Sequence, residues 1–148
     1  MLEGVLSGQT GRRLDRVNEH RIRLRGGWEW RPVISAESDP KRLTLPVRWG
    51  LRDQRRMILT RRFGRPPLEP GSRVLLQMDQ VEGVVSLSLN GESIFPVLPQ
   101  TTRYEIELPA LADRNVLVLE IELNEPAGAT TGAWSEWGQI ALIVRSRD

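Results

Sequence analysis

Apolar and polar residues alternate along residues 73–123, and this alternation restricts the stretch to β-strands. Successive side chains of a strand lie on opposite faces of a sheet, so a period of two separates a buried set from a solvated set. The stretch therefore predicts antiparallel strands with one dry face and one wet face. Three apolar sets are expected to face a core: Val85, Leu87 and Leu89; Tyr104, Ile106 and Leu108; Leu117, Leu119, Ile121 and Leu123.

Asn90 and Gly91 stand directly after the first of these sets. A type I′ turn needs positive φ at both of its central residues, and the pair Asn-Gly meets that need at low cost. We therefore expect a tight hairpin that joins residues 84–89 to residues 93–97.

Shorter extended segments are predicted on both sides of this hairpin, separated by segments rich in Gly and Pro. Together they give eight or nine strands and no convincing helix, which predicts an all-β fold, an antiparallel β-sandwich of jelly-roll type. The last segment is apolar nearly throughout, so it is expected to be central and covered on both faces. The further segments are residues 21–30, broken or bulged at Gly26-Gly27, and residues 43–49, 57–63, 74–78, 103–108, 115–123 and 139–145.

The chain has 148 residues, which is most simply one domain and is long enough to bury roughly 70% of its unfolded surface. We expect residues 1–20 to form an N-terminal arm or a short helix, and residues 21–148 to form a single β-sandwich domain. The sequence has no cysteine, and His20 is its one histidine, so neither a thiolate nor a multi-histidine metal site is expected. No metal or other cofactor is expected. Without a secretory signal or an apolar run of roughly 18 residues, a cytoplasmic protein is expected.

Charge is distributed unevenly along the chain, although the net charge is only +2. Residues 1–74 carry 17 Arg and Lys against 8 Asp and Glu, a balance of +9, whereas residues 75–148 carry 4 against 11, a balance of −7. Two domains of opposite sign would produce this, but so would a sandwich in which early strands pair with late ones. We favour the second interpretation, in which outward arginines face outward glutamates on neighbouring strands. The arginines are Arg21, Arg23 and Arg25, and the glutamates are Glu105, Glu107, Glu120 and Glu122.

Adjacent arginines occur at Arg12-Arg13, Arg55-Arg56 and Arg61-Arg62. Such pairs could form a basic patch for phosphate groups, but no aromatic residues of the kind that stack on nucleic-acid bases are interleaved with them. A solvated or cross-strand-paired face explains these arginines better. Neither nucleic acid nor a membrane is therefore an expected partner.

Several short motifs occur in a fixed order between residues 21 and 145. They are Leu24-Arg25-Gly26-Gly27-Trp28-Glu29-Trp30, Leu43-Thr44-Leu45-Pro46 with Trp49, Arg61-Arg62-Phe63, residues 81–91 ending in Leu89-Asn90-Gly91, residues 104–108 with Asn115-Val116-Leu117, and residues 138–144. This ordered set resembles the N-terminal sugar-binding jelly roll of the β-galactosidase, β-glucuronidase and β-mannosidase family, within the galactose-binding-domain-like superfamily. The resemblance implies that fold and a binding role.

The chain also departs from that family. Pro96-Val97-Leu98-Pro99-Gln100 stands where the family has a glycine-rich stretch, and the 148 residues include no immunoglobulin-like domain or catalytic barrel. Since the family's catalytic carboxylates lie on the barrel, the resemblance does not imply hydrolysis.

The irregular segment of residues 124–138 carries the strongest candidates for ligand contact, which are Trp134, Trp137 and Glu136. Indole rings stack on sugar rings, and binding sites commonly combine an apolar platform with a few polar groups. Trp49 is a further candidate. The alternative is that these indoles close an open end of the sandwich or pack at its rim.

No catalytic residues are predicted. Glu105 and Glu107 form one carboxylate pair, and Glu120 and Glu122 another, but the i, i+2 spacing places each pair on the wet face of a strand, whereas glycosidases need one shielded carboxyl group. We therefore expect a protein that is not an enzyme: a non-catalytic binding module, with carbohydrate the first ligand class to test. The alternative is a protein-interaction or scaffold domain with no small-molecule ligand, and the oligomeric state stays open.

Overall fold

The computed structural model describes residues 17–33, 39–49, 56–94, 103–123 and 136–147. These ranges contain ten strands, and no helix among them has the length and hydrophobicity needed to cross a membrane. The prediction of an all-β fold is confirmed, with ten strands rather than eight or nine. The strands are β1 (Val17–Arg23), β2 (Trp28–Pro32), β3 (Lys41–Leu43), β4 (Arg56–Gly64), β5 (Arg73–Asp79), β6 (Val84–Leu89), β7 (Glu92–Ser93), β8 (Arg103–Glu107), β9 (Arg114–Glu122) and β10 (Gln139–Arg147).

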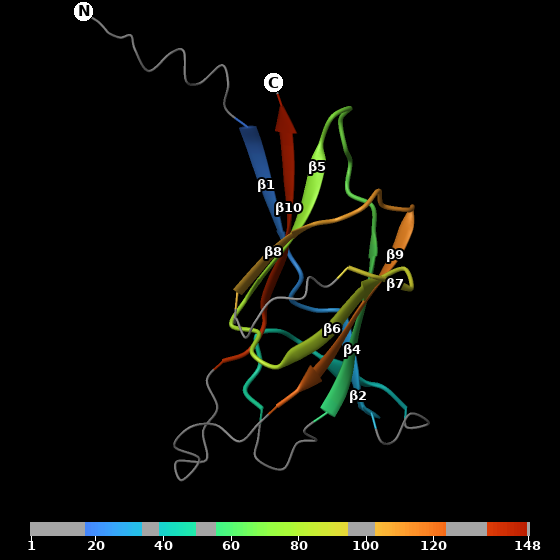
Figure 1. Cartoon of the computed structure of the whole chain (residues 1–148), viewed down its shortest axis with the longest axis vertical. Helices are drawn as coiled ribbons and strands as arrows, with labels where there is room; N and C mark the ends of the chain where they lie inside the picture. Colours follow the sequence, from blue (N-terminus) through green and yellow to red (C-terminus); the bar gives the residue numbers. More distant parts are fainter. Residues whose placement is uncertain (1–16, 34–38, 50–55, 95–102, 124–135, 148) are drawn as a thin grey trace, which may run out of the picture.

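The strands form two antiparallel sheets packed as a sandwich (Figure 1). The first sheet has the order β1-β10-β5-β8, and the second has the order β3-β2-β4-β9-β6-β7. The first strand of the chain pairs with the last, and β4 pairs with β9, so strands far apart in the sequence lie side by side. This interleaving is what a jelly-roll sandwich requires.

Local signals predicted most strand ends to within a few residues, but the segment expected at residues 43–49 overlaps β3 only at Leu43. The strand expected from residue 21 begins at Val17, so residues 17–20 extend the first sheet. Asn90 and Gly91 have φ values of 54° and 85°, as the predicted hairpin requires, and β6 pairs with β7 across them.

Val85 does not face the core, contrary to the prediction. Its side chain is 44% exposed, whereas that of Val84 is buried. The register of β6 against β9 shifts between Val84 and Ser86, which marks a β-bulge. Because a bulge inserts one extra residue, it reverses the alternation on one side, and only Leu87 and Leu89 face the core as predicted.

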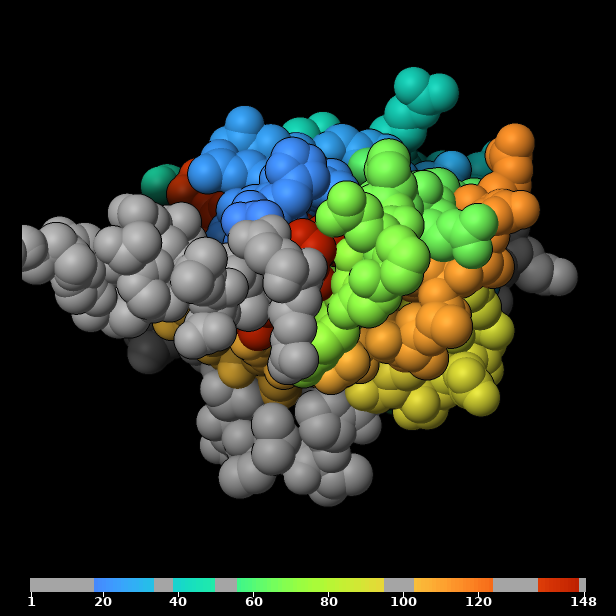
Figure 2. Space-filling model, turned by 90° about the horizontal axis from the view of Figure 1, so that it is seen from above, coloured from blue at the N-terminus to red at the C-terminus, as the bar shows by residue number. Residues whose placement is uncertain are grey.

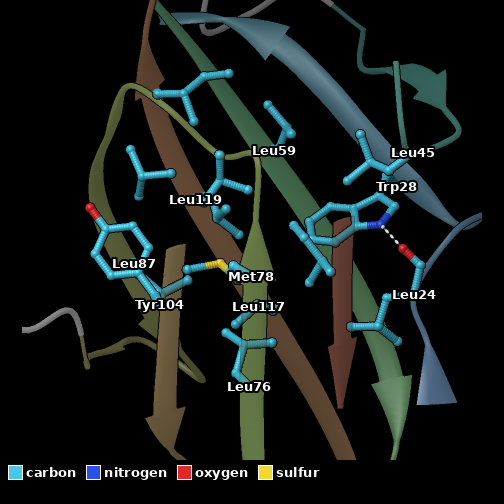
Figure 3. Packing of buried hydrophobic residues seen from close by; sticks show 14 of the residues in the cluster. Leu24, Trp28, Leu45, Leu59, Leu76, Met78, Leu87, Tyr104, Leu117 and Leu119 are labelled. Carbon is cyan, nitrogen blue, oxygen red and sulfur yellow. Dashed lines mark hydrogen bonds between the residues drawn. The ribbon is translucent and has the colours of Figure 1, made fainter. Parts of the chain in front are cut away.

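The core between the sheets is built from the inward side chains of both (Figure 3). Leu76 and Met78 of β5 pack in one cluster with Leu119 of β9. Trp28 is fully buried there, and its indole Nε1 donates a hydrogen bond to the carbonyl of Leu24 at 2.8 Å. Truncating a buried aromatic side chain of this size costs about 3–5 kcal/mol, so this residue is one of the main contributors to stability.

Strand β10 is covered on both faces, as its apolar sequence predicts. Ile140 and Leu142 face the core, whereas Ala141 and Ile143 lie on the outer face and form a second buried cluster with Leu75. Seen from above, β10 (red) shows between β1 (blue) and β5 (green), its two neighbours in the sheet (Figure 2).

Ion pairs across neighbouring strands account for the uneven charge. Arg56 of β4 pairs with Glu120 of β9 at 2.5 Å, and Arg73 of β5 pairs with Glu107 of β8 at 2.8 Å. In each pair the arginine comes from the basic half of the chain and the glutamate from the acidic half. The interleaved topology therefore brings the two halves into contact, as predicted, but through Arg56 and Arg73. The arginine named in the prediction that forms a side-chain contact, Arg21, bonds to Gln77 rather than to a glutamate.

Candidate functional site

Trp137 lies in the core rather than at the surface. Its side chain is 2% exposed, and its backbone N–H and C=O exchange hydrogen bonds with Val47 at 2.8 and 2.9 Å. The indole Nε1 donates to the carbonyl of Glu82 at 2.8 Å. The ring is therefore fixed inside the protein.

Trp49 is also buried, with 4% of its surface exposed. Its ring lies edge-on to Trp30, with centroids 6.3 Å apart, and to Trp137, with centroids 6.0 Å apart, the T-shaped arrangement that aromatic pairs favour. The Nε1 atom of Trp49 is buried and has no hydrogen-bond partner among the described residues. The predicted stacking platform is therefore not formed by Trp49 and Trp137 in the described structure, because both rings are packed in the core.

Glu136 is exposed. Trp134 lies outside the described residues. A ligand contact by Trp134 or Glu136 stays a prediction.

Replacing Trp137 by phenylalanine is expected to destabilise the fold more than replacing Trp49 by phenylalanine. Trp137→Phe leaves the Glu82 carbonyl without its indole donor, which adds about 1–2 kcal/mol to the free-energy cost of the smaller ring. The Nε1 of Trp49 has no partner to lose in the part of the chain that the structure describes. Chemical denaturation followed by far-ultraviolet circular dichroism compares the two variants. Equal losses would contradict the different roles assigned to the two indole N–H groups.

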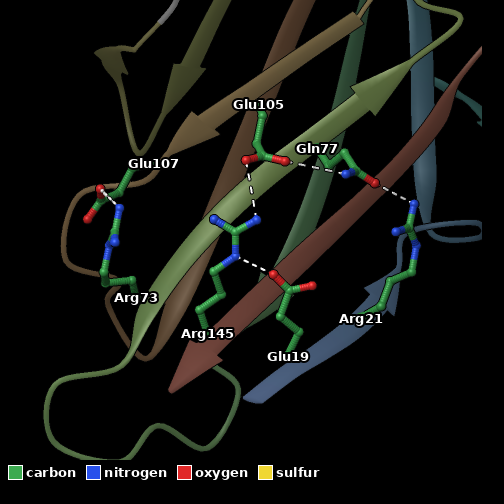
Figure 4. A network of polar contacts seen from close by, with 7 residues as sticks. All are labelled: Glu19, Arg21, Arg73, Gln77, Glu105, Glu107 and Arg145. Carbon is green, nitrogen blue, oxygen red and sulfur yellow. Dashed lines mark hydrogen bonds and ion pairs between the residues drawn. The ribbon is translucent and has the colours of Figure 1, made fainter. Parts of the chain in front are cut away.

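The outer face of the sheet β1-β10-β5-β8 carries long polar side chains over an apolar floor (Figure 4). The floor consists of Leu75, Ala141 and Ile143, each no more than 5% exposed. Ile143 stands opposite Leu75 in the strand register, which brings these side chains together. The side chains above the floor come from all four strands, so the surface that meets solvent is polar.

These polar side chains are joined in one row across the sheet. Arg21 donates to Oε1 of Gln77 at 2.5 Å, and Gln77 donates to Glu105 at 3.5 Å. Arg145 then bridges Glu105 at 3.4 Å and Glu19 at 2.5 Å. The hydrogen bond to Glu19 is the main cause that raises the pKa of Arg145. Each side chain in the row is therefore oriented by its neighbours.

The ion pair of Arg73 and Glu107 lies on the same face. The hydrogen bond from Arg73 lowers the pKa of Glu107, and the hydrogen bond to Glu107 raises the pKa of Arg73. A general acid of a glycosidase needs a raised pKa, so the shift of Glu107 is in the opposite direction.

A pocket of about 240 Å³ lies beside this network, where β1 ends and β10 begins. Arg21, Arg23 and Arg25 line it together with neutral residues that include Gln139 and Ala141. Arg23 stands opposite Ala141 in the strand register, and this small side chain leaves space beside the long guanidinium groups. We call this hollow the arginine pocket.

Two wider hollows have less suitable walls. One of about 350 Å³ is lined by Glu19, Glu69 and His20 among others, so it mixes acids with a histidine. The other, of about 680 Å³, is lined by Arg62, Asp113, Arg114 and Asn115 among others, so it mixes both signs of charge. The side chain of Asn115 exchanges hydrogen bonds with the backbone of Ala112 and is bonded to Asn90 and Phe63, so it has no donor left for a ligand. Within the described ranges, no three residues of the metal-ligating types gather into a group.

Sequence reasoning found the three arginines of the pocket but assigned them to ion pairs across strands. Their alternation up to Gly26-Gly27 correctly predicted one outward face. What it could not supply is the neighbour across the ladder, which is Ile143 for Arg21 and the small Ala141 for Arg23, rather than a glutamate.

Neither a protein-family model nor a curated protein sequence matches the chain. Solved structures do match. A β-glucuronidase from an uncultured Clostridium sp. superposes with a TM-score of 0.64 at 15% identity, covering 90% of this chain and 30% of that one. A Bifidobacterium dentium β-glucuronidase complexed with coumarin-3-O-glucuronide gives 0.61 at 13% identity, covering 89% and 31%. A putative β-galactosidase from Bacteroides fragilis gives 0.63 at 13% identity, covering 85% and 23%.

These likenesses confirm the predicted resemblance at the level of the fold. The chain is an all-β sandwich of the kind found as one part of β-glucuronidase and β-galactosidase structures. It spans less than a third of the length of each of these three.

Proposed function

We propose that the protein is a non-catalytic carbohydrate-binding module. The observation that carries the proposal is the fold match, because nearly the whole chain corresponds to a single part of enzymes that are named for glucuronide and galactoside substrates. One of them was solved with a bound glucuronide.

The outer face of the four-stranded sheet supports a binding role. Sugar hydroxyls are donors and acceptors at once, and planar Arg, Gln and Glu side chains can meet them with paired hydrogen bonds. Gln77, Glu105 and Arg145 are held in one orientation by the contacts between them and their neighbours. A ligand at this face would therefore meet polar groups that are already ordered, which reduces the entropic cost of binding.

The carboxylates support the non-catalytic part of the proposal. Glu105, Glu107 and Glu120 are each paired with an arginine on an exposed sheet face. At Glu107 the hydrogen bond from Arg73 lowers the pKa, so this carboxyl group is a poor proton donor near neutral pH.

The scaffold alternative has less support. A docking surface for another protein commonly presents a contiguous apolar patch. Among the described residues, the large apolar side chains that are exposed are Leu68, between β4 and β5, and Val85, on β6. Two side chains in separate segments make no such patch.

The proposal is tested by native affinity electrophoresis and calorimetry with a panel of neutral and acidic oligosaccharides. We expect saturable binding of at least one class and no release of reducing sugar on long incubation. These two methods are preferred to tryptophan fluorescence, because Trp28, Trp49 and Trp137 are buried and would respond little to a ligand at the outer face. Binding of no glycan in the panel would overturn the proposal, and so would hydrolysis of a bound one.

A further inference from the structure

The arginine pocket brings three positive charges together, and none of the described residues in its walls is a carboxylate. Its lining is Arg21, Arg23 and Arg25 with uncharged residues. The exposed arginines Arg56, Arg73 and Arg62, by contrast, are each paired with a glutamate at 2.5–3.1 Å.

Within the described part of the chain, the charges of these three arginines are not neutralised. Arg21 is hydrogen-bonded to Gln77, which carries no charge. Arg23 and Arg25 form no hydrogen bond or ion pair through their side chains with any described residue. Guanidinium groups gathered at one hollow repel one another, and an anion between them would relieve that repulsion.

The walls of the pocket are held by backbone hydrogen bonds. Leu24 N–H donates to the carbonyl of Ile140 at 2.9 Å, and Leu45 N–H donates to the carbonyl of Arg25 at 2.8 Å. Gly138 has a φ of 97°, and a Cβ there would lie 3.0 Å from Leu45, so this wall also requires a glycine. Arg21 is oriented by Gln77, and the site therefore exists before a ligand arrives.

The size of the pocket limits what can enter. Its volume of about 240 Å³ is smaller than the roughly 300–1,000 Å³ of pockets that enclose drug-sized ligands. One charged unit at the end of a larger molecule fits better than a long segment of a polymer. Guanidinium forks match carboxylate and other oxyanions with two parallel hydrogen bonds.

We propose that the arginine pocket binds the anionic group of an acidic sugar unit, a uronate carboxylate or a sulfate ester, so that the module selects acidic over neutral glycans. This inference rests on the proposed function. The outer-face row beginning at Arg21 and Gln77 then offers hydrogen bonds to the hydroxyls of the same sugar or of the next one.

The test compares two double variants of equal charge change in the full chain. Arg23→Gln with Arg25→Gln removes the two guanidinium groups of the pocket that have no partner. Arg42→Gln with Arg48→Gln removes two exposed arginines that do not line it. The ligands are a uronate oligosaccharide, a sulfated oligosaccharide, the matching neutral oligosaccharide and a single-stranded DNA oligomer. Thermal unfolding of both variants should match that of the unchanged protein, because all four side chains are exposed.

We expect binding of the acidic oligosaccharides to weaken about tenfold or more in the pocket variant and to change little in the control variant. The uronate and sulfated arms show which oxyanion is preferred, and a response to either supports the inference. Equal affinity for the neutral oligosaccharide would overturn the inference while the proposed function stands. Binding of no glycan would overturn both. Equal losses in the two variants, or equally tight binding of DNA, would indicate non-specific attraction to positive charge and would overturn the inference.

Discussion

Gly83→Ala is expected to lower the free energy of unfolding by about 3 kcal/mol or more, since it combines backbone strain with a steric clash. Gly83 has a φ of 88°, which L-residues rarely adopt, and an added Cβ would lie 2.4 Å from the backbone oxygen of Glu122. The neighbouring chain cannot move away easily, because Glu122 N–H donates to the carbonyl of Gly83 at 2.7 Å. Denaturant titration monitored by circular dichroism measures the loss.

Gly71→Ala is the matched control for this prediction. Gly71 has a similar φ of 85°, but nothing lies within 4 Å of the position of an added Cβ. The free energy of unfolding of Gly71→Ala should therefore fall only by the cost of the unfavourable backbone conformation, about 1–2 kcal/mol. If the free energy of unfolding falls equally in the two variants, the close approach of Gly83 to β9 does not contribute to the loss in Gly83→Ala.

Asn115→Leu is expected to lower the free energy of unfolding by about 3–5 kcal/mol, because it leaves several buried polar groups without hydrogen-bond partners. Asn115 is 1% exposed and is the one buried polar or charged residue among the described residues. Its side chain accepts hydrogen bonds from the Ala112 N–H at 2.9 Å and from Asn90 Nδ2 at 3.0 Å. It donates to the carbonyls of Ala112 at 2.9 Å and Phe63 at 3.4 Å. Denaturant titration checks the size of the loss.

Asn90→Gly provides a graded comparison. It removes one of the hydrogen bonds to Asn115 and the bond from the Val116 N–H, while glycine keeps the positive φ of the turn. We expect a loss of about 1–2 kcal/mol, well below that of Asn115→Leu. A larger loss from Asn90→Gly would indicate that the turn, rather than the buried amide of Asn115, organises this end of the sandwich.

Much of the fold was predictable because its signals are local. The alternation around Leu117, Leu119 and Ile121 required only that neighbouring side chains of a strand point to opposite faces, and these three residues are indeed buried. Asn90-Gly91 required only the backbone preference of two residues. Val85 escaped prediction because a bulge depends on the partner strand, and β9 is not adjacent in the sequence.

The candidate site was less predictable. Trp137 and Trp49 have the residue type that stacks on sugars, but type does not distinguish a surface ring from a core ring. Burial of Trp137 depends on its pairing with Val47 and on the Glu82 carbonyl, both far away in the chain. The arginine pocket depends in the same way on the pairing of β1 with β10.

The sequence by itself determined the class of fold, the hairpin turn and the separation of basic and acidic halves. Only the tertiary structure decided which of the described indoles are buried, that Asn115 links three segments, and that three arginines lie around a hollow that no described carboxylate lines. The physical reason is that strand period and turn preference act over a few residues. Burial and charge pairing, in contrast, are set by the ladder that joins the first strand to the last.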